Sequence, residues 1–498
     1  MEIRVMQGSI TEVESDALVV NLFEGVTLPG GATGAVDRAL GGKITELIQA
    51  GEITGKANKT ALIHTFGKIA PKRVLVIGLG KSEDFDYIAA AKAAGSAAKF
   101  LRDKGVRTIT SIVHGAGIGG FEPIDAARAT VEGAIIALYR PGLYKTSDED
   151  ETEVESFTIV EMDPKKIPEF EAGALEGRVL ADATNDARTL TNEPSNIMTP
   201  TALADHARQV AEEYNLDIVI LDREQMEALG MGGLLSVAQG SAQPPKLICL
   251  SYKAEGERPT LGLIGKGITF DSGGISIKPG EGMMNMKCDM AGGASVIHAM
   301  RAIADLKPNI NVLGVVPAAE NMPSGSAFRP GDVIKCYSGK TVEIVTTDAE
   351  GRMIVADAIT FAIEKGANYL VDIATLTGSC VVALGQNVTG IMGNDEWLLD
   401  NITDAAMLAG ELVWELPMPS EYMEQLKSEI ADVKNCGTRW GGALTGGLFL
   451  KEFAQDLPWV HMDIAGTSDS DKDEPYRAKG ATGVGVRTLA LLAMRLGE

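Results

Sequence analysis

Residues 73–114 read RVLVIGLGKSEDFDYIAAAKAAGSAAKFLRDKGVRTITSIVH, and this stretch predicts a strand, a helix and a second strand. Arg73–Gly78 and Thr108–His114 are short apolar runs rich in β-branched residues, which is typical of buried strands. Asp86–Lys104 lies between them and is rich in alanine, the strongest helix former. Such an alternation indicates a mostly parallel sheet with crossover helices.

The same alternation continues through the second part of the chain. Helices are predicted at Ala294–Leu306 and Met353–Lys365. Strands are predicted at Asp217–Leu221, Lys246–Tyr252, Thr260–Gly265, Asn311–Pro317, Thr341–Thr346, Tyr369–Ile373 and Trp459–Ile464. A chain of 498 residues is too long for one ordinary core. We therefore predict two α/β domains: a small N-terminal domain at residues 1–164 and a larger C-terminal domain at 192–498 with a central mixed sheet. A helical linker at 165–191 is expected to join them.

The composition restricts the class of partner and the compartment. The formal net charge is −23, which argues against a general nucleic-acid binder, because such proteins use Lys and Arg to displace counterions from phosphates. The opening MEIRVMQGSI has no basic stretch followed by an apolar one, and no apolar run is long enough to cross a bilayer. The 5 cysteines lack CxxC spacing, which is typical of reduced thiols. We expect a cytoplasmic protein with no membrane partner.

One segment combines a buried strand with an unusual density of ionisable side chains. It is LGLIGKGITFDSGGISIKPGEGMMNMKCDMAGG, from Leu261 to Gly293. Lys266, Asp271, Lys278 and Asp289 follow the predicted strand and lie among glycines. Open α/β sheets bind their ligands at the carboxyl ends of strands, so this segment is a candidate site.

A second segment, VEIVTTDAEGRM at Val342–Met353, leads from a predicted strand into a predicted helix. Asp348, Glu350 and Arg352 are spaced two residues apart, so an extended backbone would project all three side chains from one face. The helix that follows would place Arg352 at a helix N-terminus, where anions bind readily.

Carboxylates gathered in one cleft repel each other strongly unless cations neutralise them. Two divalent metal ions about 4 Å apart, bridged by carboxylate oxygens, would meet that need and are suited to hydrolysis. A metal can also bind a neutral lysine amine, because burial and the ion both favour loss of the proton. A shell rich in oxygen, without thiolate, suits zinc, manganese or magnesium.

Several of these motifs resemble the signature of the leucine aminopeptidase family, also called the cytosol aminopeptidases. They are KGITFDSGG at Lys266–Gly274, Lys278, MKCD ending at Asp289, and TDAEGR at Thr347–Arg352. The resemblance covers roughly residues 180–498, while the N-terminal third resembles the family's macro-like domain only loosely. It implies an aminopeptidase that removes leucine and other apolar residues from the N-terminus of peptides, working as a homohexamer.

The resemblance also assigns roles to individual residues. It implies that Lys266, Asp271, Asp289, Asp348 and Glu350 bind two divalent ions per subunit, with Asp271 and Glu350 bridging them. The ions would be manganese or zinc, with magnesium as an option at one site. Two further roles follow from the resemblance: Lys278 stabilises the tetrahedral intermediate, and Arg352 holds a bicarbonate ion that acts as general base. Four residues would line the substrate cleft: Met286, Thr375, Leu376 and Gly378.

Three alternatives remain open from the sequence. The same carboxylates could serve another two-metal hydrolase, such as a phosphatase. A DNA-binding or regulatory protein is disfavoured by the charge, and an inactive relative by the presence of every ligand position. The acidic stretch SDSDKDEPY at Ser468–Tyr476 is expected to alter either the rim of the pocket or an oligomer contact.

Overall fold

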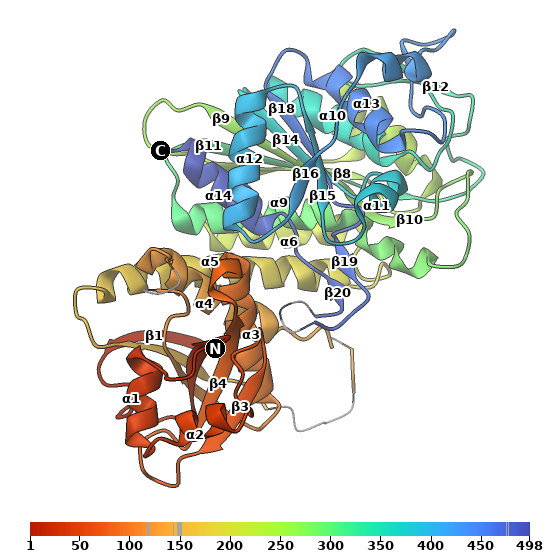
Figure 1. Cartoon of the computed structure of the whole chain (residues 1–498). Helices are drawn as coiled ribbons and strands as arrows, with labels where there is room; N and C mark the ends of the chain where they lie inside the picture. The colour runs from red at the N-terminus through yellow and green to blue at the C-terminus, as the bar shows by residue number, and fades with distance from the viewer. Residues whose placement is uncertain (117–119, 143, 147–151, 475, 477) are drawn as a thin grey trace. The chain divides into compact units, whose positions relative to one another are not determined.

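The protein is described from a computed structural model that covers residues 1–116, 120–142, 144–146, 152–474, 476 and 478–498 (Figure 1). The chain forms two compact units. Unit 1 comprises Met1–Asp182 and Lys472–Ala478, and unit 2 comprises Ala183–Asp471 and Lys479–Glu498. The border at residue 182 falls inside one long helix, α5 (Ile167–Asn192).

Unit 1 is built on a six-stranded sheet with the order β1-β6-β5-β2-β4-β3. Every neighbouring pair is parallel except β3 and β4. Its strands are β1 (Glu2–Gln7), β2 (Ala17–Phe23), β3 (Thr60–His64), β4 (Arg73–Gly80), β5 (Thr108–Ser111) and β6 (Ser156–Glu161). The predicted parallel arrangement of Arg73–Gly78 and Thr108–His114 is therefore present, with β2 between the two strands.

Helices cover both faces of this sheet because successive side chains of a strand point to opposite sides. Leu18 and Val20 of β2 pack with α1 and α2, whereas Val19 packs with α3 and α4. The helices are α1 (Gly31–Ala39), α2 (Lys43–Gln49), η1 (Ser82–Asp84), α3 (Tyr87–Arg102) and α4 (Pro123–Ala137). Gly133 of α4 allows a very close approach to α3: a Cβ on this residue would lie 2.1 Å from the carbonyl oxygen of Ala91.

The short segment Lys472–Ala478 belongs to unit 1, although it lies near the end of the chain. Lys99 Nζ of α3 forms an ion pair with Asp473 Oδ1 at 2.6 Å. The Tyr476 hydroxyl donates to Glu132 Oε1 of α4 at 3.1 Å. The chain therefore leaves unit 2 for a few residues and then returns to it.

Unit 2 contains a nine-stranded mixed sheet with the order β16-β15-β18-β14-β9-β11-β8-β7, and β10 pairs separately with β11. The central strands β18, β14, β9 and β11 are parallel. The strands are β7 (Asp217–Leu221), β8 (Lys246–Tyr252), β9 (Thr260–Gly265), β10 (Gly267–Asp271), β11 (Asn311–Asn321), β14 (Tyr369–Ala374), β15 (Thr389–Gly393), β16 (Val413–Glu415) and β18 (Trp459–Asp463). Two small sheets add β12 (Val333–Lys335), β13 (Thr341–Glu343) and β17 (Val433–Lys434), and β19 (Asp469–Ser470) with β20 (Gly480–Ala481).

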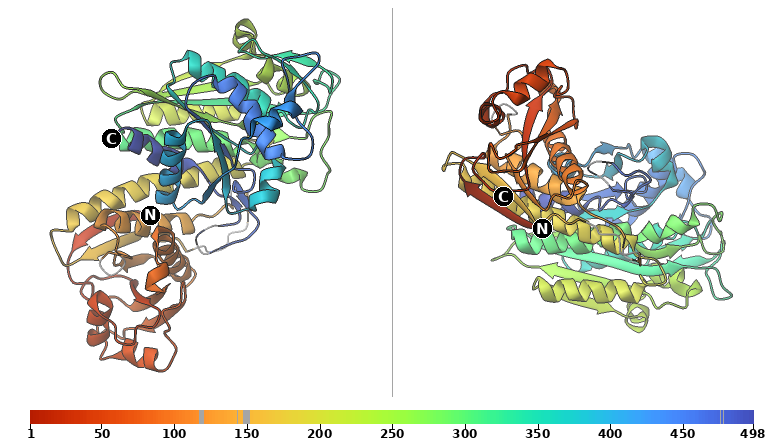
Figure 2. Two further views of the ribbon diagram at one scale, coloured as in Figure 1. Left: turned by 45° about the horizontal axis from the view of Figure 1, so that its top comes forward. Right: turned by 90° about the horizontal axis from the view of Figure 1, so that it is seen from below.

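Two groups of helices pack on the large sheet (Figure 2). One group includes α8, α10 and α13, whose apolar residues share a core with Ile264, Val315 and Trp459 of the sheet. The other includes α6, α9, α12 and α14, which contact one another. The helices of unit 2, beyond the end of α5, are α6 (Pro200–Glu213), α7 (Arg223–Leu229), α8 (Gly232–Val237), η2 (Ala238–Gly240), η3 (Met283–Met290), α9 (Ala291–Leu306), α10 (Gly351–Glu364), α11 (Gly378–Leu384), α12 (Glu396–Leu408), η4 (Ser420–Leu426), α13 (Gly442–Ala454) and α14 (Val486–Leu496).

The observed architecture agrees with the predicted class, since both units are α/β and the larger one has a mixed sheet. Within the described residues, no helix combines the length and the apolar composition that a membrane span requires.

Candidate active site

Lys266 and Asp271 lie at the two ends of β10, the strand that follows β9 in the sequence. Lys266 separates β9 from β10, and Asp271 is the last residue of β10. The backbone N–H of Lys266 donates to the carbonyl of Ile373 at 3.1 Å, and its carbonyl accepts from Gly293 N–H at 2.8 Å. These bonds fix Lys266 at the carboxyl ends of β9 and β14, the edge where α/β sheets bind ligands.

Asp348 and Glu350 reach the site from a loop and not from a strand. The expectation of an extended segment is wrong, because β13 ends at Glu343 and the chain turns at Thr347 and Asp348. Glu350 already has helical dihedral angles (φ −75°, ψ −36°) as the N-cap of α10. Arg352 lies in the first turn of α10, as the sequence predicted.

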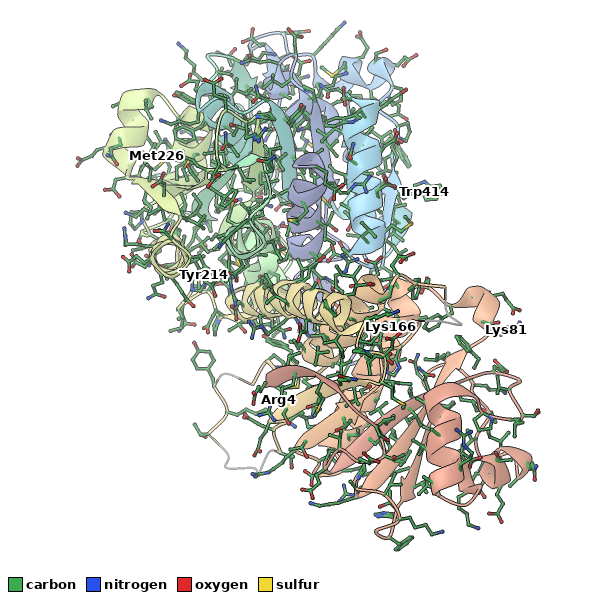
Figure 3. All side chains as sticks on the ribbon, turned by 90° about the vertical axis from the view of Figure 1, so that its left-hand side faces the viewer. Arg4, Lys81, Lys166, Tyr214, Met226 and Trp414 are labelled. Carbon is green, nitrogen blue, oxygen red and sulfur yellow. The ribbon has the colours of Figure 1, made fainter. Side chains whose placement is uncertain are left out.

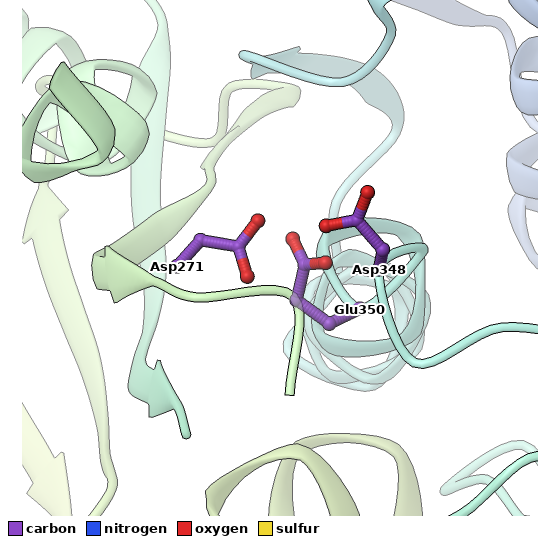
Figure 4. Close-up of side chains that lie close together, drawn as sticks. All are labelled: Asp271, Asp348 and Glu350. Carbon is purple, nitrogen blue, oxygen red and sulfur yellow. The ribbon is translucent and has the colours of Figure 1, made fainter. Parts of the chain in front are cut away.

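Three carboxylates converge at this point (Figure 4). Each of Asp271, Asp348 and Glu350 offers one oxygen, and these oxygens all lie within 4.8 Å of one another. Asp271 and Glu350 are buried, whereas Asp348 is exposed. Carboxylate oxygens at this spacing could hold a divalent cation, since the oxygen atoms would otherwise repel each other.

Two lysines form ion pairs with these carboxylates and with Asp289, which lies near the end of η3. Lys266 Nζ is 2.8 Å from Asp289 Oδ2 and 2.9 Å from Glu350 Oε1. Lys278 Nζ is 2.8 Å from Asp271 Oδ2 and 2.5 Å from Asp348 Oδ1. The cluster therefore joins four carboxylates to two ammonium groups and keeps an excess of negative charge.

This excess shifts the protonation equilibria of the cluster. Burial, with the Glu350 charge, raises the pKa of Asp271 to about 6 despite the two lysines. Burial likewise raises the pKa of Asp289 to about 8. Burial opposes ionisation of Glu350, but Lys266 and Lys278 lower its pKa below the usual value. Burial opposes the charge of Lys278 as well, yet Asp271 and Glu350 raise the pKa of this lysine. The site is thus built to accept further positive charge.

Two neutral side chains orient the carboxylates, and one of them was not predicted. Asn321 Nδ2 donates to Asp271 Oδ1 at 2.8 Å and to the carbonyl of Thr347 at 2.9 Å. Asn321 is fully buried at the end of β11 and lies opposite Asp271 in the β10–β11 register. Thr375 was predicted to line the substrate cleft, and its hydroxyl also donates to Asp289 Oδ1 at 2.7 Å.

A cavity of about 350 Å³ opens onto this cluster. Ten of the predicted site residues line it: Lys266, Asp271, Lys278, Met286, Asp289, Asp348, Glu350, Thr375, Leu376 and Gly378. The cavity has further walls that the sequence did not predict, among them Cys288, Val381 and Gln386.

Arg352 is the predicted site residue that does not line the cavity. Its guanidinium is buried and donates from one terminal nitrogen to the carbonyl of Asn435 at 2.8 Å. Its Nε has no hydrogen-bond partner among the described residues. Burial lowers the pKa of Arg352 because a buried cation is disfavoured.

Comparison with protein families places both units in one family. The catalytic domain of the cytosol aminopeptidase family matches residues 185–490, and the N-terminal domain of the same family matches residues 19–148. Probable cytosol aminopeptidases of Solibacter usitatus and Alkaliphilus metalliredigens are 47% and 45% identical to this chain. Each alignment covers 99% of this chain and 99% of the relative.

Solved structures lead to the same family. A tomato leucine aminopeptidase mutant superposes with a TM-score of 0.88 at 30% identity, over 99% of this chain and 96% of the other. The bottromycin maturation enzyme BotP in complex with Mn gives a TM-score of 0.86 at 32% identity, over 97% of this chain and 100% of the other. The chain belongs to the cytosol aminopeptidase family. It is accordingly a metal-dependent aminopeptidase, a hydrolase of peptide bonds.

Proposed function

We propose that this protein is a cytoplasmic leucyl aminopeptidase that releases leucine and other apolar residues from the N-terminus of peptides, using two divalent ions and a bound bicarbonate. The observation that carries the proposal is the convergence of Asp271, Asp348 and Glu350 within 4.8 Å of one another beside a cavity of about 350 Å³. A cavity of this volume suits one amino-acid side chain together with the peptide bond that follows it.

The donor set fits two divalent ions. The residues that would hold them are Lys266, Asp271, Asp289, Asp348 and Glu350. Glu350 Oε2 is buried and has no hydrogen-bond partner among the described residues, so this oxygen could accept a metal ion. We propose manganese or zinc, with magnesium as an option at one site; the Mn complex of BotP supports manganese. When bound, such ions polarise the scissile carbonyl and lower the pKa of a bound water.

The two lysines are suited to different roles. The Lys266 side chain is 3% exposed and lies among carboxylates, which supports a role within the metal shell. The Lys278 side chain is 22% exposed and lines the cavity, so its ammonium can reach the substrate. We propose that Lys278 Nζ donates a hydrogen bond to the oxyanion that develops on the scissile carbonyl, as a preorganised donor does.

Arg352 is proposed to hold the bicarbonate that takes a proton during the reaction. The unpaired Nε of this buried guanidinium supports the assignment, because a buried cation needs an anion or another acceptor. Arg352 and Leu376 both lie close to Gly446: a Cβ added there would be 3.3 Å from Leu376 Cδ2 and 3.4 Å from an Arg352 nitrogen. An anion held there would border the substrate cleft.

The apolar preference follows from the walls of the cavity. Met286, Leu376 and Val381 line it and would contact the first side chain of the peptide. Thr375 and Gly378 complete this part of the lining. We expect peptides and further copies of this chain to be the partners, with no nucleic acid, given the net charge of −23.

Chelation tests the metal-dependent part of the proposal. Exhaustive chelation, checked by elemental analysis, should abolish hydrolysis of leucine 4-nitroanilide, and adding back manganese or zinc should restore it.

Acetyl-leucine 4-nitroanilide should not be cleaved, because the free α-amine is proposed to bind at the metals. Turnover of 4-nitrophenyl phosphate in preference to the leucine anilide would instead identify a two-metal phosphatase.

A further inference from the structure

The cavity that holds the catalytic carboxylates has a second acidic side. Asp469 and Asp471 line the same 350 Å³ cavity as Asp289 and Met286. They are part of the acidic stretch Ser468–Tyr476, which was expected at either the pocket rim or an oligomer contact. The structure places its first residues in the cavity; Pro475, in the same stretch, lies outside the described residues.

Asp469 is held on a fixed piece of backbone. It is the first residue of β19 and pairs with Ala481 of β20 (Figure 1). Ser468 on one side is held twice: its N–H donates to the carbonyl of Ile464 at 2.9 Å, and its carbonyl accepts from Thr482 N–H at 3.0 Å. The carboxylate is therefore presented from a hydrogen-bonded frame, as specificity determinants need to be.

In the part of the chain that the structure describes, the negative charge of Asp469 is not neutralised by an ion pair. Among the described residues, no Lys, Arg or His nitrogen lies within 4.0 Å of the Asp469 or Asp471 carboxylates. Burial and the charge of Asp471 raise the pKa of Asp469, while the more distant charges of Lys287 and Lys479 oppose this shift. The Lys287 Nζ instead donates to the carbonyl of Asn192 at 2.5 Å.

The walls between these two acidic sides are apolar. Met286, Leu376 and Val381 line the same cavity. A side chain that fits both kinds of surface has a long aliphatic stem and a cationic tip. Lysine and arginine have this form, since they bury their methylene groups along apolar surface and keep the charged end in a polar environment.

We propose that Asp469, with Asp471 beside it, makes this enzyme release N-terminal arginine and lysine from peptides as well as leucine. The inference rests on the proposed function, because it assumes that the first residue of the peptide occupies this cavity. Asp469 is expected to raise kcat/KM more for N-terminal arginine than for N-terminal lysine. The guanidinium is less strongly hydrated and can bind a carboxylate through two parallel hydrogen bonds. N-terminal glutamate is expected to be a poor substrate, because its carboxylate would face an unpaired like charge.

The test uses the full-length, metal-loaded enzyme and the 4-nitroanilides of leucine, methionine, lysine, arginine and glutamate. For Asp469→Asn, the ratio of kcat/KM for arginine to that for leucine should fall at least about tenfold, as expected for the loss of a hydrogen bond between charged groups. The change should lie mainly in KM. Asp469→Glu should recover most of the ratio, and added salt should lower the wild-type ratio more than the Asp469→Asn ratio.

Asp400→Asn is the matched control, because Asp400 is an exposed residue of α12 that does not line the cavity. It makes the same change of total charge and should leave the arginine-to-leucine ratio as in the wild type. An unchanged ratio in Asp469→Asn, or an equal loss for all five substrates, would overturn the inference while leaving the aminopeptidase assignment intact. Failure of the wild-type enzyme to cleave any of the five anilides would overturn the proposed function itself.

Discussion

Lys266 and Lys278 carry the same charged group in different surroundings, and this difference predicts different mutant phenotypes. Lys266 is enclosed by Asp289 and Glu350, so Lys266→Ala should weaken one of two metal sites, and excess metal should partly relieve the defect. Lys278→Ala should keep both ions but lose about 3–4 kcal/mol of transition-state stabilisation, roughly a hundred- to a thousandfold in turnover. Metal stoichiometry and steady-state kinetics of both variants measure these outcomes.

Lys278→Arg is a useful control, because a planar guanidinium cannot replace a compact ammonium at short range, and rescue should be poor. Loss of metal from Lys278→Ala but not from Lys266→Ala would mean that the two roles are reversed. Full activity in both alanine variants would show that this cluster is not the active site.

Arg352→Ala should lower turnover without changing the metal content, because Arg352 contacts none of the carboxylates of the cluster. The wild-type rate should depend in part on added bicarbonate, and this dependence should be absent in the variant. A thermal melt of the variant separates this effect from loss of folding, since the side chain is buried. If carbonate-free buffer leaves the wild-type rate unchanged and Arg352→Ala is fully active, the bound anion has no place in the mechanism.

The residues of the cluster could be predicted from sequence, but the way in which they meet could not. Asp348 and Glu350 were expected to converge because of extended backbone, and they converge because of a turn followed by a helix start. Asn321 was missed because its apolar surroundings in β11 look like ordinary core. Its contact with Asp271 arises only from strand pairing between residues that are 50 positions apart.

At the scale of elements, α10 begins against the Lys266 side chain. A Cβ on Gly351, the first residue of this helix, would lie 2.5 Å from Lys266 Cε and 2.7 Å from Nζ. Gly351→Ala should therefore displace the Lys266 amine, although alanine is the better helix former and should not destabilise α10. A displacement of about 1 Å in an active site can cost roughly a hundredfold in rate.

The measurements for Gly351→Ala are the melting temperature, the metal affinity and kcat/KM. Gly325→Ala is the control, because a Cβ there would meet no atom within 4 Å. The explanation fails if Gly351→Ala keeps wild-type activity, or if it loses activity only because the protein unfolds.

Strands with clear apolar runs were predicted well, and short strands with unusual partners were not. β7, β8 and β9 have the predicted bounds, because each is an apolar run that turn residues delimit. The predicted strand Thr341–Thr346 is shorter in the structure and ends at Glu343, where the loop to Asp348 begins. β10 was missed, since GITFD follows β9 after a single residue and pairs only with β11. Tertiary packing decides which strands pair, and the local sequence of a strand does not reveal its partner.

At the scale of the whole molecule, we predict that the enzyme assembles as a homohexamer. Large apolar side chains are exposed on β16 and α12, including Trp414 and Met407, which are 66% and 67% exposed. Trp414 is labelled in Figure 3. Exposed apolar surface of this kind favours association with further copies. Analytical ultracentrifugation should give a mass about six times that of the 52.5 kDa chain. A monomer at micromolar concentration would contradict the prediction.

The return of Lys472–Ala478 to unit 1 has a consequence for genetic exchange between relatives. A single crossover near residue 182 would combine unit 1 of one parent with a seven-residue piece of the other. Asp473 and Tyr476 would then face positions 99 and 132 from a different parent, where Lys99 and Glu132 now bind them. Chimaeras should therefore tolerate the exchange of the N-terminal unit only when this distant heptapeptide is exchanged with it. The two pieces would then be inherited together, although nearly three hundred residues of the other unit separate them.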